Sequence, residues 1–373
     1  MKIGIDAKWF FDGPPSGRRV VRSLVRSLVE VTGADDELHF FLDARARNNT
    51  PAGVEPRHCH YVWGGVNQLA NVFVVPREAD RLRLDAVVYQ NFTPPQRGVH
   101  HARIAFVHGI VFAERPEFFT WRERLYFAPL RALASRADRV CTVSESEKVR
   151  LVRHGYALAE RVDVIPNAVD DVFVPREAAD GSSIANVLTA NGLREPFVLY
   201  VGRLSAGKNV ATLVRAMAHV TTADLTLVVV GDPDRTCRDL PLIARAAGVE
   251  ARVRFVGAMA DESLSALYVA AAVFCFPSFD ESFGLPPLEA MAAGTPVVCS
   301  NRPALVETCG DAAVYVDPTD PVAIARAIDA LLSDPPRRAA LREAGLRRAS
   351  TFKWRHSAER LLASVRAAVE NRA

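Results

Sequence analysis

The chain has 373 residues, of which 49% are hydrophobic and 24% charged, and this ordinary globular composition excludes a largely disordered protein. A chain of this length is expected to hold about two domains, each large enough to bury a core. The formal net charge of only +3 gives no reason to expect nucleic acid as a partner, and no apolar run approaches the roughly 18 residues that a membrane span requires.

The first half of the chain alternates short β-branched runs with amphipathic segments. These runs predict strands at residues 3–7, 38–42, 86–89, 103–108, 139–144 and 162–165, and a helix is predicted at residues 18–31. Strands of this kind with helices between them favour a parallel sheet covered on both faces. Met1 leads straight into the first strand without a signal-peptide pattern, so we expect a cytoplasmic protein.

The second half restarts the same alternation. Residues 169–195 are polar and without periodicity, and we interpret them as a linker between an N-terminal domain (1–168) and a C-terminal domain (196–352). Strands are predicted at residues 197–201, 225–230, 253–256 and 273–276, with a helix at 209–219, and the chain is helical from Pro321 almost to its end. The sequence therefore predicts an α/β fold of two doubly wound, Rossmann-like domains that face each other across a cleft.

The cysteines and histidines give no sign of a metal site. The six cysteines are scattered without a C-x-x-C pair and lie mostly in apolar surroundings, so we expect reduced core thiols: Cys59, Cys141, Cys237, Cys275, Cys299 and Cys309. His58 and His60 flank a cysteine on a strand-like segment. Neighbouring strand residues point to opposite faces and no fourth ligand lies near, so we expect no metal there.

Residues 279–299 predict a loop, a short helix and a strand. Pro286 and Pro287 suit the first turn of a helix, where a missing N–H costs nothing, and Gly294 with Pro296 ends it. Residues 297–299 then continue as a strand. This arrangement places two acids on one small element, Glu281 in the loop and Glu289 in the helix.

The entrance to this predicted helix combines two binding properties. The backbone N–H groups of the entering loop can converge on an anion: Phe283, Gly284 and Leu285. Gly284 also allows the backbone to approach a ligand closely. Because carboxylates accept hydrogen bonds from hydroxyl groups, a ligand with both phosphates and sugar hydroxyls would use both properties.

A second loop, residues 201–209, turns from a strand into a helix and carries Arg203 and Lys208. An arginine can bind two phosphate oxygens at once, a lysine supplies a point charge, and the helix end adds partial positive charge, so the loop suits a nucleotide diphosphate. Without their context, both residues would be interpreted as solvated loop charges.

The string from Glu281 to Glu289, with Phe-Gly-Leu-Pro between them and Ala-Gly-Thr-Pro-Val-Val after them, closely resembles the donor-sugar motif of retaining glycosyltransferases of family 4. Mannosyltransferase-like members are the most similar. The resemblance implies the two-domain GT-B architecture and a last helix, within residues 353–373, that packs back on the first domain. It also implies that Arg203 and Lys208 bind the diphosphate, Glu281 a hydroxyl of the transferred sugar, and Glu289 the ribose. We expect the base of the nucleotide to bind at the end of the strand that carries Val256 and Gly257.

Two further segments resemble parts of the same family. His108 ends a predicted strand, where the family has a histidine facing the donor sugar, although Gly109 replaces the usual aspartate. Considered alone, His108 would be interpreted as a structural histidine. Residues 13–17, ending at Gly17, resemble the glycine-rich loop near the donor phosphates, with an unusual Pro-Pro insertion.

The predicted function is metal-independent transfer of a hexose, with retention of configuration, to a hydroxyl of a glycan or lipid-linked acceptor in polysaccharide biosynthesis. The preferred donor is GDP-mannose, and no cofactor is expected. Two alternatives remain: an epimerase-like or phosphorylase-like enzyme of the same fold, and a non-catalytic nucleotide-sugar-binding partner. A phosphorylase would need a cofactor-bearing lysine, for which only Lys208 is a candidate.

A lipid-linked acceptor would bring the protein to the inner face of the membrane. Arg18, Arg22 and Arg26 line one side of the predicted first helix, and residues 118–127 mix aromatic side chains with arginines. We predict peripheral membrane contact through these segments. The alternative interpretation is a solvated helix face and ordinary core aromatics.

Overall fold

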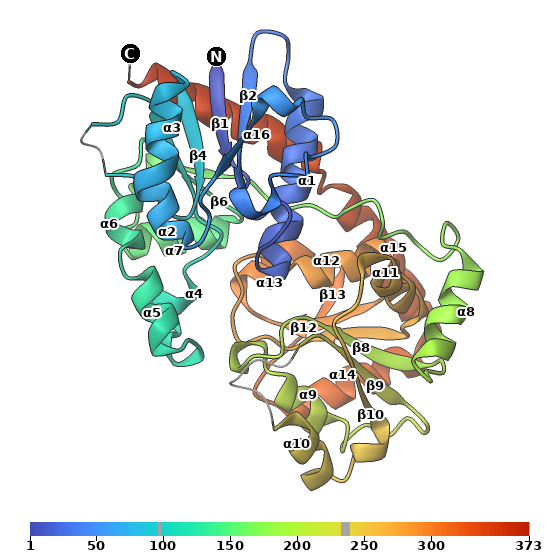
Figure 1. Ribbon diagram of the computed structural model, residues 1–373. Helices are drawn as coiled ribbons and strands as arrows, with labels where there is room; N and C mark the ends of the chain where they lie inside the picture. Colours follow the sequence, from blue (N-terminus) through green and yellow to red (C-terminus); the bar gives the residue numbers. More distant parts are fainter. Residues whose placement is uncertain (96–97, 233–238, 373) are drawn as a thin grey trace. The chain divides into compact units, whose positions relative to one another are not determined.

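The computed structural model describes residues 1–95, 98–232 and 239–372. The chain divides into two compact units. Unit 1 comprises Met1–Asn167 together with Lys353–Ala373, and unit 2 comprises Ala168–Phe352. The last segment of the chain therefore belongs with the first half and not with the residues that precede it (Figure 1).

In the described part of unit 1, seven parallel strands form one sheet in the order β3-β2-β1-β4-β5-β6-β7. The strands are β1 (Lys2–Asp6), β2 (Glu37–Asp43), β3 (Cys59–Val62), β4 (Ala86–Gln90), β5 (Ala102–Phe106), β6 (Arg139–Thr142) and β7 (Val162–Val164). The helices are α1 (Pro15–Val31), α2 (Asn67–Leu69), α3 (Val75–Arg81), α4 (Val111–Glu114), α5 (Trp121–Phe127), α6 (Leu130–Ala134), α7 (Glu145–Arg153) and α16 (Trp354–Glu370), with a π-helical segment at Ala70–Val74.

In the described part of unit 2, six parallel strands form a sheet in the order β10-β9-β8-β11-β12-β13. The strands are β8 (Phe197–Val201), β9 (Thr226–Val230), β10 (Val253–Gly257), β11 (Val273–Phe276), β12 (Val297–Ser300) and β13 (Ala313–Val316). The helices are α8 (Gly181–Ala190), α9 (Val210–Ala216), α10 (Leu240–Ala246), α11 (Asp261–Ala270), α12 (Leu285–Ala292), α13 (Pro303–Cys309), α14 (Pro321–Ser333) and α15 (Pro335–Ser350). The prediction of two doubly wound parallel sheets is confirmed.

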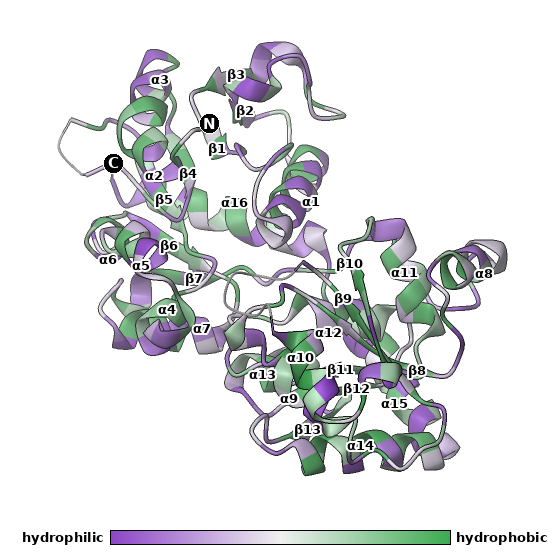
Figure 2. Cartoon of the chain, turned by 60° about the horizontal axis from the view of Figure 1, so that its bottom comes forward, coloured by the Kyte–Doolittle hydropathy of each residue, from purple (hydrophilic) through white to green (hydrophobic). Residues whose placement is uncertain are grey.

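The strands pair in parallel because they are apolar on both faces and helices bury them. The residues of β4 and β8 are all buried, and the strands of unit 2 are coloured largely as hydrophobic in Figure 2. In unit 1, α16 packs against α1 and against β4, β5 and β6 (Figure 1). The C-terminal helix thus covers a sheet formed by the first half of the chain.

Helix α1 uses its apolar side in this packing. Val21, Leu24 and Leu28 are at most 2% exposed, so they belong to the core. On the basic side, Arg22 donates from Nε to the Phe10 carbonyl at 2.6 Å, and its guanidinium lies 5.9 Å from the Phe10 ring centre. The predicted free stripe of arginines on this helix is therefore interrupted, because Arg22 is held by the loop that follows β1.

The structure differs from the prediction for residues 169–195. This segment was expected to be a linker, but it lies in unit 2 and contains α8, which packs against α11. The side chain of Asp180 caps α8 by accepting from the N–H groups of Ser182 and Ser183. The helix escaped prediction because its polar, weakly periodic sequence depends on this cap and on packing. The edge strand β13 was also missed.

The five cysteines in the described residues are buried free thiols, as predicted: Cys59, Cys141, Cys275, Cys299 and Cys309. Cys237 lies outside the described residues. His58 and His60 cluster with His39 of β2, where His39 Nδ1 is 2.9 Å from His60 Nε2. Nevertheless, across residues 1–95, 98–232 and 239–372, no group of three or more His, Cys, Asp or Glu side chains could hold a metal ion.

Each sheet has one place where the strand order changes direction. In unit 1 this place lies between β1 and β4, and in unit 2 it lies between β8 and β11. Open parallel sheets bind ligands just beyond the carboxyl ends of the strands at such a switch point. The loops that follow these four strands are therefore the first places to look for a functional site.

Candidate active site

The loops after β8 and β11 meet at the switch point of unit 2. Lys208, in the first loop, donates from Nζ to Glu281 Oε1, in the second, at 2.6 Å. The backbone reinforces this contact, because the Phe279 N–H donates to the Gly207 carbonyl at 2.9 Å. The structure thus brings together a cation and an acid that lie 73 positions apart in the chain. Arg203, earlier in the same loop, is exposed.

Two polar residues that the sequence analysis did not single out hold these loops in place. Asn209 is 4% exposed and its side-chain amide donates to the carbonyls of Pro277 and Pro318, at 2.9 and 2.6 Å. Ser278 is fully buried and its hydroxyl donates to the Gly207 carbonyl at 3.2 Å. Asn209 has a left-handed backbone with φ of 57°, which asparagine tolerates better than most residues. The asparagine that directly follows Lys208 was the feature of the sequence that could have indicated this contact.

Helix α12 begins as predicted, with Pro286 in its first turn and Gly284 just before it. Gly284 has φ of 111°, and a Cβ at this position would lie 2.6 Å from a methyl carbon of Leu305. Both the backbone conformation and the space therefore require glycine. The first turn carries no acidic residue, so the N–H groups at this helix end face no carboxylate from their own turn.

Glu289 lies deeper than Glu281. It is 1% exposed, and its Oε2 accepts a hydrogen bond from the Tyr268 hydroxyl at 2.9 Å. The Glu281 side chain, in contrast, keeps 11% exposure. The two acids of the motif thus occupy different environments: Glu281 is partly exposed on the loop, and Glu289 is buried on α12 beside Tyr268.

Glycines directly follow β8 and β9 and form the last residue of the adjacent strand β10. A Cβ on Gly231 would lie only 1.9 Å from the Gly202 carbonyl oxygen, so the residue after β9 must be glycine. Gly257 has φ of 74° at a register shift of β10, and a Cβ there would meet no atom within 4 Å. Its neighbour Val256 is half-buried. The loops that follow β8 and β9 are joined by a bond from the Leu204 N–H to the Asp232 carbonyl at 3.1 Å, so these strand ends lie beside the loop that carries Arg203.

At the switch point of unit 1, His108 follows β5 and contacts the end of β4. The distance from His108 Nε2 to Gln90 Oε1 is 2.6 Å. Behind Gln90 lies a buried cluster in which Asp6 Oδ1 binds Lys8 Nζ at 2.5 Å and Asp6 Oδ2 binds Asn71 Nδ2 at 2.8 Å. Burial lowers the pKa of His108 to about 4, so its imidazole is neutral near pH 7.

Gly17 lies inside α1 and not in the loop before it, because the helix begins at Pro15. A Cβ on Gly17 would be 3.0 Å from the indole of Trp9, and one on Gly13 would be 2.9 Å from the same side chain. The two glycines therefore make room for Trp9, whose ring centre is 6.0 Å from that of His108. The first turn of α1, which includes Gly17, carries no acidic residue.

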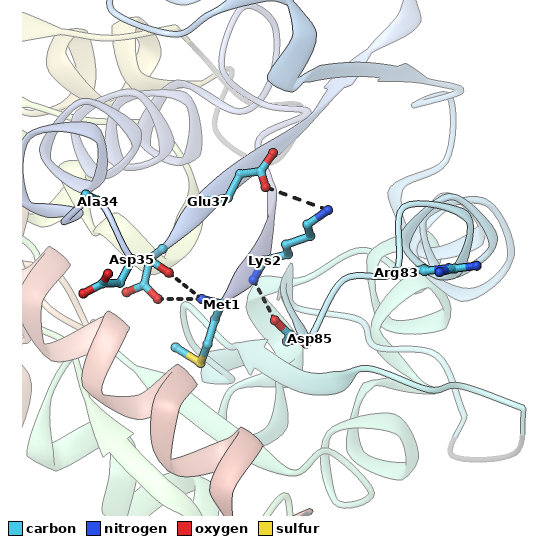
Figure 3. A pocket seen from close by; sticks show the side chains of 8 residues that line it. Met1, Lys2, Ala34, Asp35, Glu37, Arg83 and Asp85 are labelled. Carbon is cyan, nitrogen blue, oxygen red and sulfur yellow. Dashed lines mark hydrogen bonds and ion pairs between the residues drawn. The ribbon is translucent and has the colours of Figure 1, made fainter.

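A surface hollow in unit 1 lies away from these residues. Met1, Lys2, Glu37 and Asp85, at the amino ends of β1, β2 and β4, contribute to its lining (Figure 3). The Met1 amino group bonds the Asp35 carbonyl at 2.7 Å, and the Lys2 N–H donates to Asp85 at 2.7 Å. The hollow is therefore at the opposite edge of the sheet from His108, and it forms no part of the candidate site.

The two parallel sheets form the GT-B fold of glycosyltransferases. Two solved structures share the fold: a sucrose-phosphate synthase of Thermosynechococcus elongatus (TM-score 0.75, 22% identity, 98% of each chain) and the HepE protein of Anabaena in complex with UDP and glucose (TM-score 0.74, 20% identity, 98% of this chain and 100% of that one). At these identities the likeness concerns the fold alone.

Sequence comparison identifies the family of the chain. Residues 17–173 match the family described as Glycosyltransferase Family 4, and residues 189–348 match Glycosyl transferases group 1. The O-antigen chain mannosyltransferase B of Escherichia coli is 32% identical over 269 residues, which cover 71% of this chain and 69% of that protein. The chain therefore belongs to the glycosyltransferase family that these two descriptions and the E. coli relative represent.

A second group of relatives carries another name. The D-inositol 3-phosphate glycosyltransferase of Rhodococcus opacus is 33% identical over 249 residues, 64% of this chain and 55% of that protein. The chain thus spans about half the length of the first curated relatives it matches. Within the described residues, no helix is both long enough and apolar enough to cross a membrane.

Proposed function

We propose that this chain is a retaining hexosyltransferase that moves a hexose from a nucleotide sugar to a hydroxyl group without a metal ion. The observation that carries the proposal is the Lys208–Glu281 pair at the switch point of unit 2. It sets a cation that suits a diphosphate 2.6 Å from a carboxylate that suits a sugar hydroxyl. A nucleotide sugar carries both groups at adjacent positions.

In this proposal the residues of unit 2 bind the donor. Arg203 and Lys208 bind the diphosphate, and Glu281 accepts a hydrogen bond from a hydroxyl of the hexose. Glu289 accepts hydrogen bonds from the ribose hydroxyls in addition to the one from Tyr268. The backbone at the start of α12 contributes N–H groups: Phe283, Gly284 and Leu285. The backbone at Val256 and Gly257 contacts the base. In unit 1, Gly17 and His108 contribute to the phosphate and sugar positions.

The chemistry needs charge stabilisation more than a protein nucleophile. The bond from the anomeric carbon to the diphosphate oxygen breaks, and a bond from the same face of that carbon to the acceptor oxygen forms. The acceptor's proton passes to the departing phosphate oxygen. Arg203 and Lys208 stabilise the negative charge on that phosphate, which is the kind of electrostatic contribution that lowers barriers most.

GDP-mannose is the donor we propose. The name of the E. coli relative, a mannosyltransferase, supports this choice, whereas the HepE structure contains UDP and glucose. Thermal unfolding with a panel of nucleotide sugars tests it, because a ligand at a hundred times its dissociation constant stabilises a fold by about 2.7 kcal/mol. GDP-mannose should raise the midpoint most. A larger shift with UDP-glucose would reassign the donor, and no shift with any member would contradict the proposal.

For the acceptor, we propose a glycan or lipid-linked hydroxyl handled by unit 1, with peripheral contact to a membrane. Exposed large apolar side chains gather on two segments of unit 1: Trp63, Val66, Leu69 and Phe73 around α2, and Trp121 and Leu125 on α5. Arg122 lies 5.3 Å from the Trp121 ring centre, and this mixture of aromatic and basic side chains suits an interface.

Sedimentation with vesicles tests this contact. The double variant Trp121→Ser with Leu125→Ser should bind anionic vesicles less than the wild type does, whereas Leu158→Ser, which removes a 58% exposed side chain elsewhere in unit 1, should not. If the wild type partitions equally between vesicle-bound and free fractions with anionic and neutral lipid, and the double variant matches it, the membrane contact is wrong and the acceptor is soluble.

A further inference from the structure

The polar contacts around Gln90 determine the orientation of its side-chain amide. Gln90 Nε2 lies 3.2 Å from the backbone carbonyl of Asp6. A carbonyl oxygen can only accept, so the nitrogen of the amide must face it and the oxygen must face the other way. That oxygen, Oε1, lies 2.6 Å from His108 Nε2.

The same donor and acceptor assignments then determine which ring nitrogen of His108 carries the proton. Gln90 Oε1 is an acceptor, so His108 Nε2 must be the donor and must carry the ring proton. The low pKa of His108, which burial sets at about 4, keeps the ring neutral near pH 7. In the neutral ring the other nitrogen, Nδ1, then has a lone pair. Among the described residues, none hydrogen-bonds to Nδ1.

A buried ion pair fixes the backbone of Gln90 beside Asp6, whose carbonyl orients the side-chain amide. Asp6 is fully buried and binds Lys8 through Oδ1, while its Oδ2 accepts from the backbone N–H of Gln90 at 3.2 Å. Asn71 Nδ2 donates both to Asp6 Oδ2 and to the Gln90 carbonyl, so Asn71 Oδ1 is left to accept from Lys8 Nζ at 2.5 Å. Every donor and acceptor in this cluster thus agrees with a single arrangement of the two amides.

We propose that Gln90 is a positioning residue that holds His108 as the neutral Nε2–H tautomer, so that His108 Nδ1 accepts a hydrogen bond from a sugar hydroxyl. The inference rests on the proposed function for the identity of the ligand. A neutral ring nitrogen with a lone pair attracts a hydroxyl hydrogen but not a phosphate oxygen.

Ring nitrogen NMR tests the tautomer without any substrate. Long-range ¹H–¹⁵N correlation spectra of the ligand-free protein between pH 5.5 and 8, with the His108 signals identified by their loss in His108→Gln, should show protonated Nε2 and unprotonated Nδ1 throughout. Gln90→Met should yield a mixture of tautomers. His101 is a matched control, because its ring bonds the Tyr89 hydroxyl and Asp80 and should keep its signals in this variant. A wild-type Nδ1–H tautomer, or no change in Gln90→Met, would overturn the proposal.

The pH profile of donor turnover adds a readout that a merely structural role would not move. Gln90→Glu places a carboxylate beside Nε2, which favours the imidazolium and so raises the pKa of His108. An imidazolium cannot accept a hydrogen bond. The variant should therefore lose activity as pH falls from 8 to 5.5, by about tenfold if one hydrogen bond is lost, while the wild type shows no such loss.

The two measurements separate the possible failures. The expected spectra with no turnover of any nucleotide sugar would reject the proposed function and retain the tautomer. Turnover with the wrong tautomer, or with parallel profiles for wild type and Gln90→Glu, would reject the role of Gln90 and retain the proposed function. If Gln90→Met fails to fold, the wild-type spectrum and Gln90→Glu decide the question.

Discussion

Removing the Lys208 ammonium should separate stability from catalysis. In Lys208→Met the side chain keeps most of its length but loses the charge that lies 2.6 Å from Glu281 Oε1. The Lys208 side chain is 28% exposed and that of Glu281 11%, so solvent screens the pair and its loss should cost about 1 kcal/mol of unfolding free energy or less. If the ammonium stabilises the departing diphosphate, turnover should fall by about 10²–10³, or roughly 2.7–4 kcal/mol.

The assays are urea unfolding and release of nucleoside diphosphate. Lys2→Met is the matched control, because Lys2 lies 3.9 Å from Glu37 in an exposed pair at the amino end of β1. It should leave turnover unchanged. The double variant with Glu281→Gln distinguishes two explanations: if Lys208 only neutralises Glu281, the double variant is no slower than Glu281→Gln alone, and if Lys208 acts on the diphosphate, it is much slower. Near-normal turnover in Lys208→Met, or a double variant that matches Glu281→Gln alone, would refute the reasoning.

Four further predictions concern the acids, the strand ends, pH and metals. Glu281→Gln should mainly lower kcat and Glu289→Gln mainly raise KM, because one touches the reacting sugar and the other the ribose; steady-state kinetics with identical effects would reject these roles. Gly231→Ala should cost about 1–3 kcal/mol in urea unfolding and disturb the adjacent Arg203 loop, because its Cβ would lie 1.9 Å from the Gly202 carbonyl oxygen; a wild-type midpoint would be incompatible with this packing. Burial lowers the pKa of His39 to about 4, so the unfolded chain binds the proton first and stability should fall as pH drops from about 6.5 towards 4; unfolding curves for His39→Gln should show a shallower fall. Turnover in excess chelator should match turnover without it, and recovery only on adding Mg²⁺ or Mn²⁺ would show a metal requirement.

The parts of the site that local sequence signals encode were predicted well. Pro286 and Gly294 bracket α12 in the sequence and do so in the structure, since a missing N–H at a helix start and a positive φ at its end are properties of single residues. The strand ends at Val201 and Phe276 could be located for a similar reason, because apolar runs stop there. The roles assigned to Arg203, Lys208 and the two acids remain predictions.

The parts that depend on contacts between distant segments were missed. Asp6 and Gln90 are 84 positions apart, and no local pattern indicates that a glutamine at the end of β4 will contact the carboxylate at the end of β1. Gly17 was predicted to lie in a loop before the first helix, whereas it lies inside α1 beside Trp9, a contact visible only in three dimensions, and its role near the phosphates remains a prediction. A charged residue as the last residue of a buried strand, as at Asp6, was the one available hint.

The central claim is hexose transfer from a nucleotide sugar, and its most direct test is a stoichiometric one. The wild type is incubated with GDP-mannose and a panel of glycan and lipid-linked acceptors, and mass spectrometry measures both free nucleoside diphosphate and acceptor that has gained one hexose. We expect the two products in equal amounts, and neither with Lys208→Met at comparable times. Failure to release nucleoside diphosphate from any donor tried, or release without a hexose on any acceptor, would contradict the account.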